Sequence, residues 1–385
     1  MRAYLDNSAT TRAYDEVAQL VAKIMTEEYG NASSVHHMGT VSGNRLYSAR
    51  ETIAETLKVD PSEIVFTSGG TESDNTAIIG AARANAWRGK HIITTSIEHP
   101  AVLESCQELV KEGFEITYLP VDETGTVRLE DLKNAIREDT ILVSMMFVNN
   151  EIGAVEPIAE AGKLIKSINE QIIFHVDAVQ AYGKFQIRPK SMNIDLLAVS
   201  AHKIHGPKGV GFLYIKKGTK IIPICYGGGQ QKGMRSGTEN VPGIAGMALA
   251  AQMCYDNFNE KISALYELKK YLMDSLTERI PDIRLNGPEC EKGAPQIVSV
   301  SIKGLAAETI LNMLSSKEIY VSAGSACTSN NPHVSDTLKA IGLDKSLLES
   351  TIRISMSTQT TKEEIDYLLE VLSSQIETMR KFYRH

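Results

Sequence analysis

Residues Asp195–Gly209 (DLLAVSAHKIHGPKG) join an apolar run to a turn of small and polar residues. The apolar run, Leu196–Ser200, predicts a strand that is buried on both faces of a sheet. Lys203 follows this strand directly, where a solvated surface lysine is poorly placed. Partial desolvation lowers the pKa of a lysine and lets its amine form a Schiff base with a carbonyl compound. The alternatives are a buried, ion-paired Lys203 and a catalytic Lys208, although Lys208 lies in a Gly/Pro turn that favours solvation.

Apolar runs and amphipathic stretches alternate on both sides of this segment, from about residue 60 to residue 215. The strand candidates are Ile64–Thr67, His91–Thr95, Ile116–Leu119, Ile141–Met146, Ile172–Val176 and Leu196–Ser200. The helix candidates between them are Thr71–Trp87, Pro100–Glu112, Leu129–Arg137 and Pro157–Asn169. This alternation predicts an α/β fold in which a mostly parallel sheet carries helices on both faces.

The C-terminal third follows a different pattern. Residues 258–280 predict one long amphipathic helix that ends before Pro281. Gly324–Val334 is rich in Gly, Ser and Asn, which predicts a loop. We expect a smaller α+β domain here, with helices at Ala306–Ser315 and Lys362–Arg380 and strands at Val298–Ile302, Tyr320–Ser322 and Thr351–Ser355.

Composition and charge exclude several classes of protein. The 385 residues include 40 Lys and Arg against 47 Asp and Glu, so the net charge of −7 gives no whole-chain footprint for nucleic acid or an anionic membrane. No apolar run reaches the roughly 18 residues of a spanning helix, and the N-terminus has no signal-peptide core. The sequence also lacks the P-loop and the usual dinucleotide motif. Five scattered cysteines without a CxxC pair argue against a metal site and fit a reducing cytoplasm: Cys106, Cys225, Cys254, Cys290 and Cys327.

Residues Thr67–Asn75 (TSGGTESDN) lie where a predicted strand gives way to a helix. Glycines here let backbone N–H groups approach an anion, and the helix N-terminus adds a favourable partial charge. Thr71 is placed to add a hydroxyl group. The segment therefore predicts phosphate binding; the alternative is an ordinary turn with Thr71 as the N-cap and Asp74 as a charge in the first turn.

Two more polar side chains end predicted strands. Asp177 needs a cationic or hydrogen-bonding partner, and a protonated pyridine nitrogen is one such partner. His99 precedes a helix that begins with Pro100, and its imidazole can stack on a flat heteroaromatic ring and exchange protons near neutral pH. The alternatives are a plain helix N-cap for Asp177 and a capping or core histidine for His99.

These candidates share one position in the predicted fold. All of them lie at the carboxyl ends of predicted strands: Thr67–Asn75, His99, Val148–Gly153, Asp177 and Lys203. Ligands of open α/β sheets bind at the carboxyl ends of the strands. A phosphate cradle, a Schiff-base lysine and a carboxylate for a ring nitrogen are the parts that a pyridoxal phosphate site needs.

With these motifs in place, the chain resembles the cysteine desulfurases, which belong to the class V aminotransferases and the fold-type I pyridoxal-phosphate enzymes. The order of the motifs along the chain makes coincidence implausible. The resemblance runs almost end to end, through Leu5–Thr11, Gly30–Ser34, Thr67–Asn75, Ile97–His99, Val148–Gly153, Val176–Gln180, Ser200–Gly209, Gly233–Thr238, Gly324–Thr328 and Ile352–Arg353.

The resemblance implies a fold-type I transferase fold, with a mostly parallel seven-stranded sheet in a large domain and a smaller α+β domain. The motif positions assign residues 15–255 to the large, cofactor-binding domain. Residues 1–14 and 256–385 are assigned to the small domain, which carries a cysteine loop at about 323–335.

For pyridoxal 5'-phosphate, the resemblance implies a role for each matching residue. Lys203 is expected to hold the cofactor through a Schiff base, His99 to stack on the ring and shuttle protons, and Asp177 to keep the ring nitrogen protonated. Gln180 and Asn150 are expected near the ring hydroxyl. A homodimer is expected, because the implied phosphate contacts are Gly70, Thr71, Ser200, His202 and, from the second subunit, Thr238.

For L-cysteine, the resemblance implies that Arg353 clamps the α-carboxylate, a bidentate task suited to guanidinium, and that Asn31 helps at the same end. Cys327 is implied to be the nucleophile. A free thiol has a pKa near about 8.5, so a small thiolate fraction is present at pH 7. Attack on the substrate sulfur gives L-alanine and a persulfide on Cys327. The plainer alternative is an unreactive surface thiol.

The sulfur is expected to pass to an acceptor protein, with no direct nucleic-acid or membrane partner. Asn330–Ser335 (NNPHVS) departs from the Leu-Glu-Pro-Ser usual in desulfurases that supply iron–sulfur scaffolds, and Ala32 replaces a usual Pro. Iron–sulfur cluster assembly and tRNA or cofactor thiolation therefore both stay open. The loop length resembles the long-loop group.

Three other functions remain as alternatives: a selenocysteine lyase, an aminotransferase, and a non-catalytic protein that binds the cofactor. Transamination does not need Cys327. The joint presence of Lys203, Asp177, His99 and Arg353 with Cys327 disfavours the non-catalytic alternative.

Overall fold

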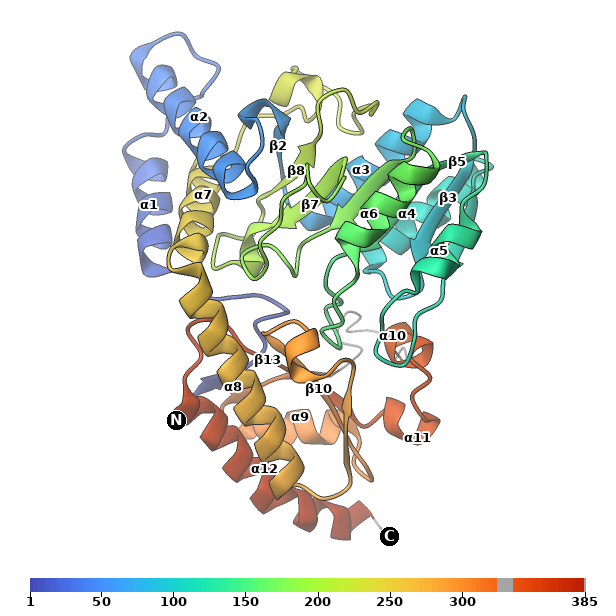
Figure 1. Cartoon of the computed structure of the whole chain (residues 1–385). Helices are drawn as coiled ribbons and strands as arrows, with labels where there is room; N and C mark the ends of the chain where they lie inside the picture. The colour runs from blue at the N-terminus through green and yellow to red at the C-terminus, as the bar shows by residue number, and fades with distance from the viewer. Residues whose placement is uncertain (324–334, 384–385) are drawn as a thin grey trace.

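The computed structural model describes residues 1–323 and 335–383. Its larger part is built on a sheet of seven strands in the order β2-β8-β7-β6-β5-β3-β4 (Figure 1). Strand β8 is antiparallel to β2 and β7, and the other pairings are parallel, which confirms the predicted α/β sheet. The strands are β2 (Ile64–Thr67), β3 (His91–Thr95), β4 (Glu115–Leu119), β5 (Thr140–Met146), β6 (Ile173–Asp177), β7 (Leu196–Ser200) and β8 (Gly211–Ile215).

Helices cover both faces of this sheet (Figure 1). Consecutive strand residues point to opposite faces, so Ile92 packs with one helix layer and Ile93 with the other. Helices α3 (Gly70–Asn85) and α4 (Pro100–Lys111) form one layer. The other layer contains α1 (Asp15–Thr26), α2 (His37–Leu57), α5 (Leu129–Ala135), α6 (Ile158–Ile168) and α7 (Val241–Tyr255). Burial on both faces explains why the strand sequences are apolar throughout.

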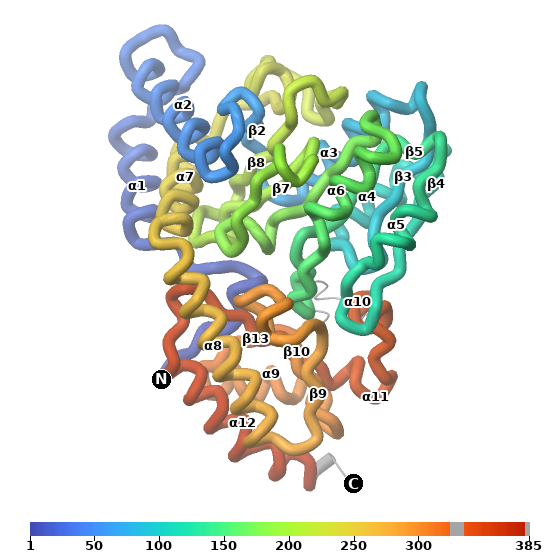
Figure 2. The backbone as a smooth tube through the Cα atoms, viewed as in Figure 1, coloured from blue at the N-terminus to red at the C-terminus, as the bar shows by residue number. Residues whose placement is uncertain are grey.

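The smaller part has its own sheet and its own hydrophobic core. An antiparallel sheet has the order β12-β13-β10-β9, and β1 pairs with β11 in a separate two-stranded sheet. Figure 2 shows α8 continuing from the end of α7 into this part. The strands are β1 (Ala3–Tyr4), β9 (Ile283–Asn286), β10 (Ile297–Ile302), β11 (Ile319–Tyr320), β12 (Ser322–Ala323) and β13 (Thr351–Ser355). The helices are α8 (Phe258–Arg279), α9 (Ala307–Ser316), α10 (Asp336–Ala340), α11 (Lys345–Leu348) and α12 (Lys362–Tyr383).

Most expected elements are present, with shifted ends. The helix expected to start with Pro157 begins at Ile158, because Pro157 has ψ of 62° and caps the helix from outside. The strand expected at Tyr320–Ser322 is divided, since β11 pairs with β1 whereas β12 pairs with β13. Strands β1, β8 and β9 were not expected. In the described part of the chain, no helix is both long and apolar enough to cross a membrane.

The N-terminal segment belongs to the smaller core, which gives a first prediction. Leu5 is completely buried there, so Leu5→Ala should lower the free energy of unfolding by about 2–5 kcal/mol. Urea unfolding followed by circular dichroism measures this change. Val110→Ala, at a half-exposed position on α4, is the control and should change it by less than about 1 kcal/mol. Equal effects of the two substitutions would contradict the packing described here.

Candidate active site

Lys203 lies at the carboxyl edge of the large sheet. Strand β7 ends at Ser200, and one turn of 3-10 helix, Ala201–Lys203, follows it. The Lys203 Nζ donates hydrogen bonds to the main-chain carbonyls of Ser8 and Ala9, the latter at 2.8 Å. The N-terminal segment therefore holds the amine at this edge.

Asp177 and His99 form an electrostatic cluster with Lys203. Asp177 ends β6, and its Oδ1 accepts a hydrogen bond from the N–H of Val179 at 2.8 Å. Burial raises the pKa of Asp177, whereas neighbouring His99 and Lys203 lower it. Burial lowers the pKa of His99, and Asp177 opposes that shift. The structure thus brings together the three residues that were expected to act on a cofactor ring.

His99 also caps helix α4, as its alternative interpretation predicted. The ring Nδ1 accepts a hydrogen bond from the N–H of Ala101 at 3.1 Å. An accepting nitrogen carries no proton, so the neutral ring has its proton on Nε2. Capping and proton exchange therefore use different nitrogens of the same ring.

The start of helix α3 has the shape and chemistry of an anion cradle. Gly69 has φ of +154°, a conformation that favours glycine, and a Cβ on Gly70 would lie 2.7 Å from Cγ2 of Val179. The first N–H groups of a helix have no partner within it. The buried Ser200 lies opposite, with its Oγ 3.7 Å from a Cβ built on Gly69, and Thr71 is exposed. These donors suit a phosphate group.

Two further buried carboxyl groups, Asp74 and Glu98, lie near Asp177. Burial, together with the charge of Asp177, raises the pKa of both groups well above the usual range. The Asp74 Oδ1 lies 3.4 Å from Nε2 of His175, and Nδ1 of His175 lies 2.9 Å from the Ser144 hydroxyl. Burial lowers the pKa of His175 to about 3, so this ring is neutral. These directions fit a protonated Asp74 beside a neutral His175, and they favour the negative charge on Asp177, whose pKa is lowered by His99 and Lys203.

Arg353 of strand β13 lies buried where the small sheet meets the large one. Its Nη1 donates to the carbonyl of Asn150 and its Nη2 to Oδ1 of Asp6, both at 2.9 Å. The Ser322 hydroxyl donates to the same Asp6 oxygen at 2.6 Å. The Arg353 Nε donates to no group in residues 1–323 and 335–383. This guanidinium therefore keeps an unused donor.

Glu151, also in the Val148–Gly153 segment, contacts the start of α10. Its Oε2 accepts a hydrogen bond from the Ser335 hydroxyl, and burial raises the pKa of Glu151 to about 7. Asn149 Nδ2 donates to the Thr337 hydroxyl at 3.3 Å. Cys327 lies outside the described residues. Of the described residues on either side of it, Ser322 pairs with Arg353 across the sheet, and Ser335 contacts Glu151.

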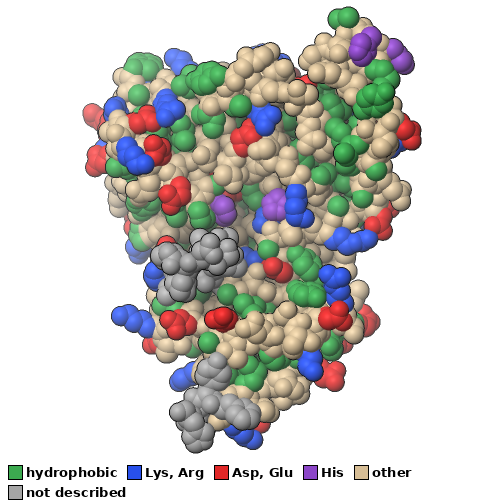
Figure 3. Space-filling model, turned by 180° about the vertical axis from the view of Figure 1, so that it is seen from behind, with side chains coloured by type: hydrophobic (Ala, Val, Ile, Leu, Met, Phe, Trp, Pro, Cys, Tyr) green, Lys and Arg blue, Asp and Glu red, His purple; other side chains and the backbone are tan. Residues whose placement is uncertain are grey.

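Gln180 and His202 lie close to Lys203. Gln180 Nε2 donates to the Ser8 carbonyl at 3.0 Å, the same oxygen that accepts from Lys203. His202 Nδ1 lies 3.2 Å from the Thr10 hydroxyl, and burial lowers the pKa of His202 to about 4. Figure 3 shows histidine and Lys or Arg side chains together at the boundary between the upper and lower parts of the molecule.

Two expected residues, Asn31 and Thr238, do not join this cluster within one chain. Thr238 is exposed. Asn31 lies in the connection between α1 and α2, where its side chain accepts a hydrogen bond from the N–H of Ser33 at 2.9 Å. This connection lies at the top of Figure 1, away from strand β13. The roles of both residues stay predictions.

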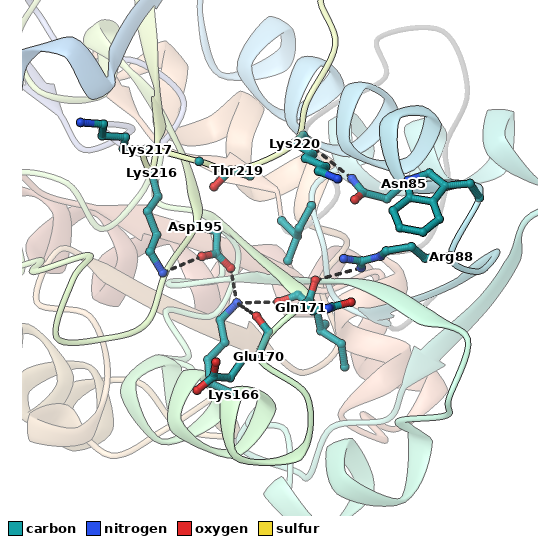
Figure 4. A pocket seen from close by; sticks show the side chains of 14 residues that line it. Asn85, Arg88, Lys166, Glu170, Gln171, Asp195, Lys216, Lys217, Thr219 and Lys220 are labelled. Atoms are coloured by element: carbon teal, nitrogen blue, oxygen red, sulfur yellow. Dashed lines mark hydrogen bonds and ion pairs between the residues drawn. The ribbon is translucent and has the colours of Figure 1, made fainter.

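A second pocket, of about 370 Å³, lies at the amino edge of the sheet (Figure 4). Asp195 lies between Lys166 and Lys216, and pairs with both. Lys166 also donates to the main-chain carbonyls of Glu170 and Ile172, between α6 and β6, and Arg88 donates to the carbonyl of Gln171 at 2.9 Å. These cationic side chains already bind groups of the protein itself. We therefore place the candidate site at the carboxyl edge.

No sequence pattern predicted a role for Asp6, Ser8 or Glu151, and Asp74 was predicted to be a charge in the first turn of a helix. The signal for Asp74 was its spacing: Ala77 and Ile78 follow it by three and four residues, so Asp74 shares the buried face of α3. For Asp6 and Ser8 no comparable pattern exists, because their contacts join distant parts of the chain.

The assignment of a proton to Asp74 gives a second prediction. A raised pKa in the folded state gives stability that is complete below the unfolded pKa and is lost as pH rises towards the folded value. Asp74→Asn mimics the protonated acid and does not suffer this loss. Between the unfolded and folded pKa values, its free energy of unfolding should therefore gain about 1.4 kcal/mol per pH unit relative to the unmodified protein. The melting temperature of Asp74→Asn should therefore exceed that of the unmodified protein, and by more at pH 8 than at pH 5. A variant that becomes relatively less stable as pH rises would show that Asp74 is ionised.

Comparisons with known proteins identify the relatives of this chain. The model of the "Aminotransferase class-V" family matches residues 3–368. "Cysteine desulfurase IscS" of Clostridium botulinum (strain Hall) is 47% identical over 381 residues, which cover 99% of this chain and 96% of the relative. "Cysteine desulfurase IscS" of Methanosarcina thermophila is 46% identical over 377 residues, covering 98% and 92%.

Solved structures show the same likeness. A "NIFS-LIKE PROTEIN" matches with a TM-score of 0.93 and 40% identity over 98% of this chain and all of that one. The structure titled "SspA in complex with cysteine" matches with a TM-score of 0.81 and 32% identity over 93% of this chain and all of that one. The predicted fold and family are confirmed: the chain belongs to the class V aminotransferase family, among relatives named cysteine desulfurases.

Proposed function

We propose that this chain is a cysteine desulfurase, which takes sulfur from L-cysteine, releases L-alanine, and carries the sulfur as a persulfide on Cys327. The observation that carries the proposal is the cluster of Lys203, Asp177 and His99 at the carboxyl edge of the sheet. Relatives named cysteine desulfurases, which match nearly the whole chain, support it.

The residues at this edge fit pyridoxal 5'-phosphate. The cradle at Gly69 and Gly70 suits the phosphate, because a side chain on Gly70 would collide with Val179. Asp177 is a buried carboxylate that suits a cationic ring nitrogen, and Lys203 supplies a primary amine. When bound, the cofactor supplies an aldehyde for that amine and a ring that withdraws electrons from the substrate.

Each residue of the cluster has a distinct task in this proposal. Asp177 would accept a hydrogen bond from the ring nitrogen, which would keep that nitrogen protonated. Lys203 would hold the cofactor through its amine, and the amine, when free, can move a proton. His99 would cover the ring and could exchange a proton at Nε2. Gln180 and Asn150 would hold the ring hydroxyl, while Gly70, Thr71, Ser200 and His202 would hold the phosphate.

In this proposal the α-carboxylate of L-cysteine binds to Arg353. The Arg353 Nε is a buried donor without a partner in the described residues, so an added carboxylate would gain a charge-assisted hydrogen bond there. The Cys327 thiolate would then attack the sulfur of L-cysteine. An S–S bond forms as the C–S bond breaks, and the carbon keeps the electron pair and takes up a proton, which gives L-alanine.

A homodimer with Thr238 at the partner's phosphate is part of the proposal. Large apolar side chains that one chain leaves in water support it: Met25, Tyr29, Val35, Tyr47 and Tyr226. The persulfide would pass to an acceptor protein in the cytoplasm, for iron–sulfur cluster assembly or for thiolation.

The role of Lys203 gives a third prediction. Lys203→Ala should abolish the visible absorption of the Schiff base in protein incubated with pyridoxal 5'-phosphate, because no other amine lies at the same position. Lys208→Ala, an exposed position, is the control and should keep the absorption. If Lys208→Ala loses the band and Lys203→Ala keeps it, the cofactor is bound by Lys208 and the assignment to Lys203 is wrong.

The role of Cys327 gives a fourth prediction and tests the proposed function directly. Cys327→Ser should bind the cofactor normally but lose sulfide release from L-cysteine, because serine cannot carry a persulfide. Intact-mass measurement after incubation with radiolabelled L-cysteine should find one added sulfur on the unmodified protein and none on Cys327→Ser. Cys225→Ser is the matched control. Full sulfide release from Cys327→Ser would overturn the persulfide mechanism.

A further inference from the structure

The turn that carries Lys203 has its main chain held on every side. All carbonyls from Ala201 to His205 accept hydrogen bonds. The donors are Ile204 N and Gly206 N to Ala201, Thr11 N and Oγ1 to His202, Lys184 Nζ to Lys203, Cys254 Sγ to Ile204, and Tyr14 N to His205. Thr11 Oγ1 also accepts from the N–H of His205 at 2.7 Å. The turn is therefore fixed by groups from three other segments.

Lys184 is the charged member of this set. Its Nζ donates to the carbonyl of Lys203 at 2.6 Å. Burial lowers the pKa of Lys184 to about 8, and the neighbouring Cys254 thiol opposes that shift. No carboxylate of the described residues contributes to the shift. Lys184 is partly buried, and removing an ammonium group from water without a counter-ion costs stability, so this residue is poorly explained as a device for stability alone.

The position of Lys184 in the chain links two parts of the site. Strand β6 ends at Asp177, and the connection that follows contains both Gln180 and Lys184. Gly183 of this connection packs on the turn, since a Cβ added there would lie 3.0 Å from Cγ2 of Ile204. The Lys184 hydrogen bond thus joins the segment after Asp177 to the main chain of Lys203.

A flat cofactor ring makes this link important. In the proposed function, Asp177 binds the ring nitrogen and Lys203 binds the carbonyl carbon of the same rigid ring. Their separation must therefore match a fixed length, and small misplacement of reacting groups costs large factors in rate.

Resting on the proposed function, we propose that Lys184 is a positioning residue for Lys203, which fixes the turn Ala201–Gly206 relative to Asp177. Its ammonium group touches neither cofactor nor substrate. It acts by holding the main-chain carbonyl of Lys203. The backbone of Lys203 then stays in one place while its side chain moves.

The test measures Schiff-base formation in Lys184→Met, which keeps the unbranched apolar stem out to the ε position and loses the donor. Cofactor-free protein is mixed with pyridoxal 5'-phosphate, and the visible absorption is followed in time. Lys184→Met should form the band about ten- to a hundredfold more slowly than the unmodified protein. Lys184→Arg, which keeps a cationic donor, should recover part of the rate. If Lys184→Met does not fold, Lys184→Leu, which also lacks a donor, replaces it.

Lys269→Met is the matched control. The Lys269 Nζ also donates to a main-chain carbonyl, that of Ala294, at 2.8 Å, and burial lowers the pKa of Lys269 to about 8. This lysine lies in α8 of the smaller part. Its loss should lower the melting temperature of the cofactor-free protein and leave the rate of band formation unchanged.

The outcomes separate the two proposals. Band formation by Lys184→Met at the rate of the unmodified protein, or an equal slowing in Lys269→Met, would overturn the positioning role. A band that persists in Lys203→Ala, or no band in the unmodified protein, would instead overturn the proposed use of Lys203.

Discussion

The hydrogen bonds from Lys203 Nζ to the carbonyls of Ser8 and Ala9 are the contact on which the rest of the site depends. The segment that supplies these carbonyls also packs Leu5 into the smaller core and places Asp6 against Arg353. One stretch of chain thus joins the large sheet, the small sheet and the reactive amine. Each part of the site is positioned by a segment from a different part of the sequence.

Electrostatics selects which of the buried groups carry charge. Three carboxyl groups share the space near the end of β6, and burial raises the pKa of each. Among Asp74, Glu98 and Asp177, Asp177 is the one whose pKa is lowered by the neighbouring His99 and Lys203. A single negative charge at Asp177 is what a protonated ring nitrogen requires. Asp74, whose pKa is raised by burial and by the charge of Asp177, would be protonated and would add no second negative charge there.

The sequence allowed the sheet and the main candidates to be predicted for physical reasons. Runs such as Leu196–Ser200 are apolar because both faces are buried, and a lysine or aspartate directly after such a run stands out. Strand β8 was not predicted, and the pairing of β1 with β11 joins residues more than 300 positions apart, which no local pattern encodes. The Asp6–Arg353 ion pair escaped prediction for the same reason.

The central claim is that the carboxyl edge of the large sheet is a cofactor site in which Lys203 forms the covalent bond. Borohydride reduction of protein loaded with pyridoxal 5'-phosphate, followed by peptide mass mapping, tests this claim most directly. We expect a stable cofactor adduct on the peptide that contains Lys203. An adduct confined to another lysine, such as Lys208 or Lys184, or the absence of any adduct on a protein that binds the cofactor, would contradict it.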